Sequence, residues 1–194
     1  MKIFEKYIIA LTNLNGIIPI KKVVEVYNIH YNQYIDIEKI KLYINIDLKQ
    51  NNIYICKNYF VHKIILVCDD YEVYMRKKRD KPYYTPNIKK LLKFYDIYYF
   101  EKSNQYYKLY NYMYNICHNS EIVEKIIKDF TILYKYINDQ IEIYRIINML
   151  GIYLEDKKKL DEVMYIFNQY KNTIRLWENN GFTKYEDCVA PCIK

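Results

Sequence analysis

The residues of this chain best suited to bind a ligand form a short basic run followed by two tyrosines. The run is Arg76-Lys77-Lys78-Arg79-Asp80-Lys81, and Pro82-Tyr83-Tyr84 follows it directly. Clustered cations attract polyanions, and aromatic rings beside them can stack on unpaired bases. The pattern therefore predicts a contact with nucleic acid. The alternative is a solvated helix end followed by an exposed loop, with both tyrosines packed inward.

The excess positive charge is confined to one half of the chain. Residues 1–97 contain 17 Lys and Arg against 10 Asp and Glu, whereas residues 98–194 contain 13 of each. The composition, with 26 Tyr but only 3 Gly and 4 Pro, is typical of a low-GC genome, which also favours Lys over Arg. Codon bias accounts for the amount of lysine but not for its confinement to one half.

No catalytic or cofactor motif accompanies this charge. Glycine is too scarce for a phosphate-cradling loop, and His30, His62 and His118 have no Cys or Ser in a motif around them. Cys188 and Cys192 form a pair without a second pair, whereas structural zinc usually has four ligands. We therefore expect a protein that is not an enzyme and binds no metal or cofactor.

Five scattered cysteines do not indicate a disulfide framework. The first residues lack the apolar region of a signal peptide, and no stretch approaches the roughly 20 apolar residues that span a bilayer. These features predict a cytoplasmic protein.

Helical spacing of apolar residues predicts three helices at the start of the chain. The first two cover residues 3–11 and 20–27 and are separated by Asn15-Gly16. Asp36 is a suitable N-cap for the third, which carries Ile37, Ile40 and Ile44.

A hairpin is expected next, because the β-rich runs 53–56 and 59–61 are joined by Lys57-Asn58. Three helices and a hairpin are the element order of a winged helix. In that fold the third helix can enter a groove and the hairpin can touch the backbone, although winged helices also bind proteins. The third helix contains Glu38 and no Arg that could read guanine, which favours phosphate contact over sequence-specific readout.

The second half reads as helices only, so the fold class is mainly α. Asp69-Asp70 can cap a short helix that carries the basic run, and residues 80–87 form the expected boundary between a winged-helix-like part, 1–80, and a helical bundle, 88–194. Apolar stripes predict the helices of the bundle at 88–99, 106–117, 123–137, 143–150 and 160–177.

Candidate partner-binding residues share a positive charge or an aromatic ring within the basic half. They are Lys39, Lys41, Lys57, Arg76, Lys77, Lys78, Arg79, Lys81, Tyr83, Tyr84, Lys89 and Lys90.

The segment 172–183, NTIRLWENNGFT, holds the only Trp of the chain. Its pattern is typical of a helix C-terminus, with Arg175 near the negative end of the dipole and Asn180-Gly181 turning the chain. The segment also resembles an "NTRLWENNG-T" stretch of uncharacterised low-GC bacterial proteins that often carry a C-terminal SEC-C zinc motif. Residues 81–86, 91–95 and 99–102 resemble the middle region of those proteins, and residues 15–19 with the hairpin resemble their opening.

The chain departs from that family at its end, EDCVAPCIK, which lacks the SEC-C pattern of cysteines. No zinc site is therefore carried over, and the resemblance implies no known reaction. A short version of such a domain in an AT-rich background would also suit a phage or another mobile element.

Two functions are expected on these grounds. The first is a non-enzymatic protein that contacts nucleic acid or a ribonucleoprotein through residues 39–93. The alternative is a phage-type inhibitor that binds a host defence protein, such as a CRISPR nuclease. The sequence leaves the oligomeric state open.

Overall fold

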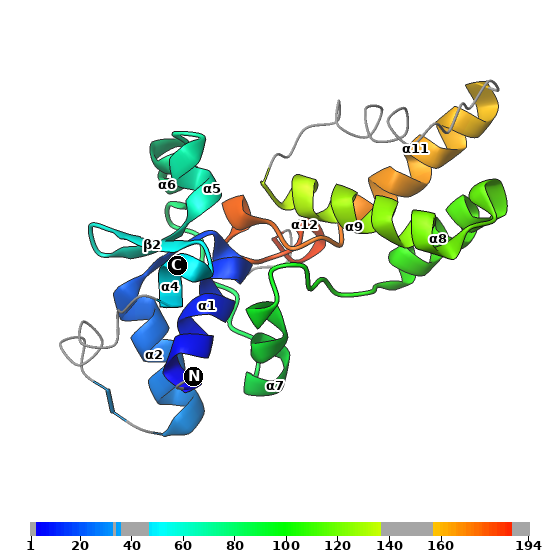
Figure 1. Cartoon of the computed structure of the whole chain (residues 1–194). Coiled ribbons are helices and arrows are strands. Elements are labelled where there is room, and N and C mark those ends of the chain that lie inside the picture. The colour runs from blue at the N-terminus through cyan, green and yellow to red at the C-terminus, as the bar shows by residue number, and fades with distance from the viewer. Residues whose placement is uncertain (1–2, 33, 36–46, 137–156, 188–194) are drawn as a thin grey trace. The chain divides into compact units, whose positions relative to one another are not determined.

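The computed structural model describes residues 3–32, 34–35, 47–136 and 157–187 (Figure 1). The chain forms two compact units. Unit 1 comprises Met1–Tyr99 and Trp177–Phe182, and unit 2 comprises Phe100–Leu176 and Thr183–Lys194. The predicted mainly helical fold is confirmed, with a small sheet near the N-terminus. The domain ranges 1–80 and 88–194 remain a prediction, and residues 80–87 belong to unit 1.

Unit 1 begins with two helices that the apolar periodicity predicted. They are α1 (Ile3–Asn15) and α2 (Ile20–Tyr31). Gly16, at φ +71°, turns the chain between them, and its N–H donates to the carbonyl of Thr12 at 2.7 Å. The predicted third helix, with its N-cap Asp36, lies outside the described residues.

Three short antiparallel strands form a sheet in the order β1-β3-β2. The predicted hairpin is confirmed as β2 (Ile53–Cys56) and β3 (Tyr59–His62). The strand β1 (Ile17–Pro19) was not predicted, and it pairs with β3 so that Ile17 lies opposite Val61. Its Pro19 also lies directly before α2, where a missing N–H costs little.

The rest of unit 1 consists of short helices. Its core contains α1 residues such as Ile8 and Leu11, together with Phe60 of β3 and Phe94. The predicted stripe 88–99 is helical only as far as Tyr95. The elements are α4 (Asp47–Gln50), α5 (Lys63–Val67), α6 (Tyr71–Lys78), α7 (Ile88–Leu91) and the 3-10 turn η1 (Leu92–Tyr95).

Unit 2 is built from longer amphipathic helices. Their apolar stripes meet in one core around Leu109, Ile127 and Phe167, as the spacing predicted. The buried Tyr170 hydroxyl lies 2.6 Å from the hydroxyl of Thr131, so this phenol is satisfied within the core. The described helices are α8 (Asn104–Cys117), α9 (Ser120–Tyr136), α11 (Lys157–Lys171) and α12 (Lys184–Asp187). The predicted helix 143–150 lies outside the described residues.

The prediction of one long helix up to residue 177 is wrong. The helix α11 ends at Lys171, and the chain continues as an irregular segment with a 3-10 turn, η2 (Trp177–Asn179). The physical reason is that Arg175 and Trp177 have partners that no single helix could satisfy. In unit 2 the Arg175 guanidinium pairs with Glu101 and makes two hydrogen bonds to the Glu186 carboxylate.

A reciprocal cap then starts α12. The Thr183 N–H donates to the Glu186 carboxylate at 3.0 Å, and the Glu186 N–H donates to the Thr183 hydroxyl at 3.2 Å. This is the capping-box arrangement. Burial raises the pKa of Glu186, but the hydrogen bonds from Arg175 and Thr183 together outweigh it and hold this pKa below its usual value. None of the described helices is both long and apolar enough to cross a membrane.

Candidate nucleic-acid interface

The basic run occupies the last turn of α6 and the residues that follow it, but its cations differ in exposure and in their partners. Arg76 and Arg79 are exposed, and no acidic side chain pairs with either among the described residues. Lys77 is exposed and forms an ion pair with Glu178, with 2.8 Å between Nζ and Oε2. Lys78 is buried. The run is therefore not one uniform basic surface.

The Lys78 ammonium is a structural group inside unit 1. Its Nζ donates to the backbone carbonyls of Asn15 at 2.7 Å and Trp177 at 2.8 Å, and it lies 5.5 Å from the ring centroid of Tyr83. A buried ammonium persists only where acceptors replace its water shell. Lys78 is therefore not a contact residue, contrary to the prediction. Its ammonium is buried and binds the backbone carbonyls of Asn15 and Trp177, which joins α6 to two other segments of the chain.

Lys81 faces the same segment as Lys78. Its Nζ donates to the Asn179 side-chain oxygen at 2.8 Å and to the Glu178 carbonyl at 3.3 Å. The Asn180 amide in turn donates to the Lys81 carbonyl at 2.8 Å. The segment 177–180 thus binds Lys77, Lys78 and Lys81. Among the described residues, the two arginines are the exposed cations of the run that form no ion pair.

The two tyrosines after the run are partly buried against the core of unit 1. Burial raises the pKa of Tyr83 to about 12. Tyr84 meets the ring of Phe182 edge to face with centroids 5.4 Å apart, and the Lys90 ammonium lies 5.5 Å from its ring centroid. Both rings pack inward, which is the alternative that the sequence left open, so neither is a free stacking platform.

The hairpin turn brings another cation towards α6. Lys57, at φ +54°, is exposed, and its ammonium lies 5.5 Å from the ring centroid of Tyr71 and 3.7 Å from the carboxylate of Glu72. Arg76 follows Glu72 by one helical turn and therefore lies on the same side of α6. Lys57 and Arg76 accordingly belong to one strip of surface within unit 1.

The remaining predicted residues lie elsewhere. Lys89 is exposed on α7, which the side chain of Asn87 caps by accepting from the Lys90 N–H at 3.0 Å. Lys39 and Lys41 lie outside the described residues, as do Cys188 and Cys192.

The central position of Trp177 in unit 1 was not predicted from the sequence. Its side chain is fully buried, and its indole Nε1 donates to the Asn13 carbonyl at 2.9 Å. Its ring packs against that of His62, with centroids 5.0 Å apart. The sequence did carry a signal for the buried lysine nearby, since Lys78 follows the apolar Tyr74 by four residues and continues its stripe.

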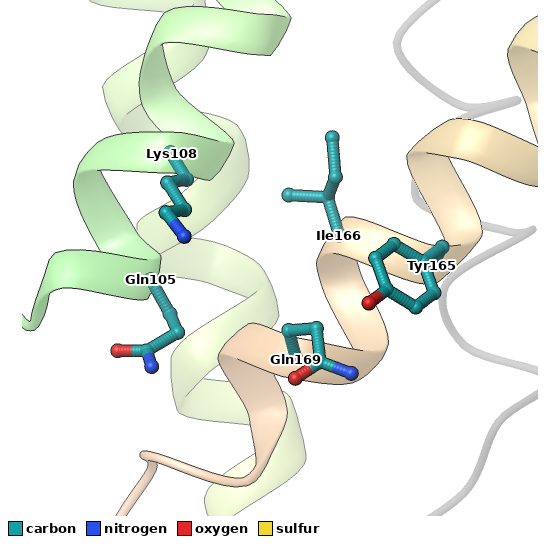
Figure 2. Close-up of a pocket in the computed structure, with 5 residues that line it drawn as sticks. All are labelled: Gln105, Lys108, Tyr165, Ile166 and Gln169. Atoms are coloured by element: carbon teal, nitrogen blue, oxygen red, sulfur yellow. The ribbon is translucent and has the colours of Figure 1, made fainter.

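No three His, Cys, Asp or Glu side chains in the described parts of the chain come close enough to hold a metal ion. A hollow of about 140 Å³ lies between α8 and α11 in unit 2 and is lined by two glutamines, a lysine, a tyrosine and an isoleucine (Figure 2). It presents neither a nucleophile with an adjacent base nor a pair of carboxylates.

Comparison with known proteins found no matching family model, no similar curated protein and no similar solved structure.

Lys78 makes the stability of unit 1 depend on pH. Burial lowers the pKa of its ammonium well below 10.5, and the charge of Lys81 lowers it further. The unfolded chain therefore binds more protons between the two pKa values, so stability rises with pH across that window. We expect the free energy of unfolding to rise between neutral pH and about pH 9.5, and to rise less in Lys78→Met, as measured by urea unfolding.

Burial also lowers the pKa of Lys171, so this lysine makes stability rise with pH in the same sense. The comparison with Lys78→Met isolates the contribution of Lys78. The range ends below pH 10 because the raised pKa values of buried tyrosines such as Tyr7 act in the opposite sense above it. Equal slopes in the two proteins would contradict the prediction.

Proposed function

We propose that this chain is a non-enzymatic binding protein whose unit 1 contacts nucleic acid or a ribonucleoprotein. The observation that carries the proposal is the strip formed by Lys57 at the hairpin turn and Arg76 on α6, with Arg79 three residues further along the chain. All three are exposed, and the two arginines are half of the four in the chain. A guanidinium offers paired donors that match phosphate oxygens.

The acid beside this strip is a weak competitor. Glu72 lies 3.7 Å from Lys57, and their side chains are 75% and 69% exposed. Exposed pairs of this kind contribute little, typically about 0–1 kcal/mol. A phosphate can therefore replace the carboxylate at Lys57 at small cost.

The element order of unit 1 supports a winged-helix-like arrangement. Two helices flank β1, and the hairpin β2–β3 joins β1 in a three-stranded antiparallel sheet. In this proposal the hairpin acts as the wing, so that Lys57 at its turn meets the sugar-phosphate backbone. The predicted third helix, with Lys39 and Lys41, would supply further phosphate contacts.

The salt dependence of binding tests the proposal. Fluorescence anisotropy with labelled duplex and single-stranded oligonucleotides should show affinity that falls steeply with salt. Each phosphate contact contributes about 0.9 to the slope of log K against log salt for duplex and about 0.7 for single strands. We expect Arg76→Ala/Arg79→Ala to lower that slope by about 1.4–1.8.

A matched control removes two exposed cations from unit 2. Lys125→Ala/Lys159→Ala changes the net charge equally and should leave the slope near that of the wild type. A flat salt dependence in the wild type, or equal losses in both variants, would overturn the proposal. Pulldown from a low-GC bacterial lysate with and without nuclease adds a second readout. A single protein partner that survives nuclease would instead favour the inhibitor hypothesis.

A further inference from the structure

The solvent face of α8 in unit 2 differs from that of its neighbours in having no acid. Six exposed side chains repeat with helical spacing along this face. They are Asn104, Tyr107, Lys108, Asn111, Tyr114 and Asn115. Residues three, four and seven apart share one side of a helix, so these form one continuous stripe opposite the buried Leu109 and Met113.

Charge separates this stripe from the other long helices of unit 2. The exposed side of α9 mixes Lys125 and Lys128 with Glu121, Glu124 and Asp129, and that of α11 includes Asp161 and Glu162. Lys108 is the one Lys, Arg, Asp or Glu in α8, and it lies on the edge of the stripe that faces α11 (Figure 2). A polyanion meets no acid along α8 itself.

Ring contacts along the helix hold the two exposed tyrosines in place. Tyr107 is 52% exposed, and its ring meets that of the buried Tyr106 edge to face with centroids 5.2 Å apart. Tyr114 is 42% exposed and stacks on Tyr110 with 6° between the ring planes and centroids 6.3 Å apart. Rings that are already oriented lose little conformational freedom when a ligand stacks on them.

We propose that this stripe, the α8 face, is a second contact surface and that it binds unpaired single-stranded nucleic acid. Bases stack on Tyr107 and Tyr114, the asparagine amides reach base edges, and Lys108 meets phosphate. A duplex hides the faces of its bases, so the α8 face selects unpaired strands. This inference rests on the proposed function but depends on base stacking, whereas the strip of unit 1 depends on charge.

Two strands of equal charge separate these contributions. One is oligothymidine of about 12 nucleotides, within the range that single-strand binders cover, and the other is an abasic strand of the same length. The variants are Tyr107→Leu/Tyr114→Leu, which lacks the aromatic faces, and Tyr107→Phe/Tyr114→Phe, which keeps them. Leucine and phenylalanine both fit a helix, and circular dichroism checks that each variant is folded.

We expect the leucine variant to bind oligothymidine at least about fivefold more weakly than the wild type, since even one stacked base contributes that much. Its affinity for the abasic strand and its salt slope should not change, and the phenylalanine variant should bind like the wild type. Equal binding of oligothymidine by the leucine variant and the wild type, or an equal loss on both strands, would overturn the inference.

The same measurements distinguish the two claims. If Arg76→Ala/Arg79→Ala lowers the salt slope while the leucine variant binds normally, the proposed function stands and the α8 face is wrong. If the wild type binds neither strand nor duplex, both claims fall.

Discussion

Trp177→Ala is expected to lower the free energy of unfolding of unit 1 by about 3–5 kcal/mol, the usual cost of removing a large buried aromatic side chain. The indole is fully buried, is hydrogen-bonded to the Asn13 carbonyl and packs against His62 and Tyr74. Its loss also releases the backbone that accepts from Lys78. The variant therefore loses packing and the arrangement of the basic run together.

Native-state hydrogen exchange measures this effect, because it resolves unit 1 from unit 2. The amides of α1 and β3 should lose most of their protection. Trp177→Phe keeps part of the ring and loses the Nε1 donor, so its cost should be intermediate. Tyr165→Ala, at a side chain that is 65% exposed, should cost about 0.5 kcal/mol or less. A loss in Trp177→Ala no larger than that of Tyr165→Ala would contradict the prediction.

Elements whose signal is local were predictable from the sequence. The helices α1, α2, α6, α8 and α9 follow from apolar spacing, and the hairpin follows from two β-rich runs around Lys57-Asn58. Each signal lies within one element and its flanking residues, so no distant partner is needed to interpret it.

Elements defined by distant partners were not predictable. The strand β1 has only three residues, and its pairing with β3 makes it a strand. The segment after Lys171 continues a helical pattern, yet Trp177 lies against Asn13 and Gly16, more than 150 residues away in the chain. Such contacts override local helix propensity, because one buried indole contributes more to the free energy of folding than one turn of helix does.

The candidate interface was predicted in part for the same reason. The clustered charge correctly predicted that Arg76 and Arg79 lie at the surface. Charge alone could not distinguish them from Lys78, which is buried because it lies on the same side of α6 as the buried Tyr74. Tyr83 and Tyr84 pack inward because the core of unit 1 reaches them. Exposed tyrosines lie instead on other elements, with Tyr107 and Tyr114 on α8.

Gly16→Ala is expected to destabilise unit 1 almost as much as the loss of Trp177. A Cβ built at Gly16 would lie 2.6 Å from Cε3 and 2.7 Å from Cγ of the Trp177 ring, far inside normal contact. The backbone is held at φ +71° by the hydrogen bond of its N–H to Thr12 and by the bond that its carbonyl accepts from the His62 N–H at 2.8 Å. Left-handed backbone costs an L-residue about 1–2 kcal/mol, and overpacking adds about 1–3 kcal/mol.

Gly181→Ala separates these two costs. Gly181 has a similar φ of +81°, but its Cβ would come no closer than 3.1 Å, to the Leu14 side chain. This variant should lose about 1–2 kcal/mol from backbone strain, whereas Gly16→Ala should lose about 2–5 kcal/mol. Repeating Gly16→Ala in a Trp177→Leu background, where no flat ring faces the new methyl group, should reduce its cost to that of Gly181→Ala. Hydrogen exchange of the α1 amides measures all four variants, and equal costs of Gly16→Ala in the two backgrounds would show that the ring contact is not the cause.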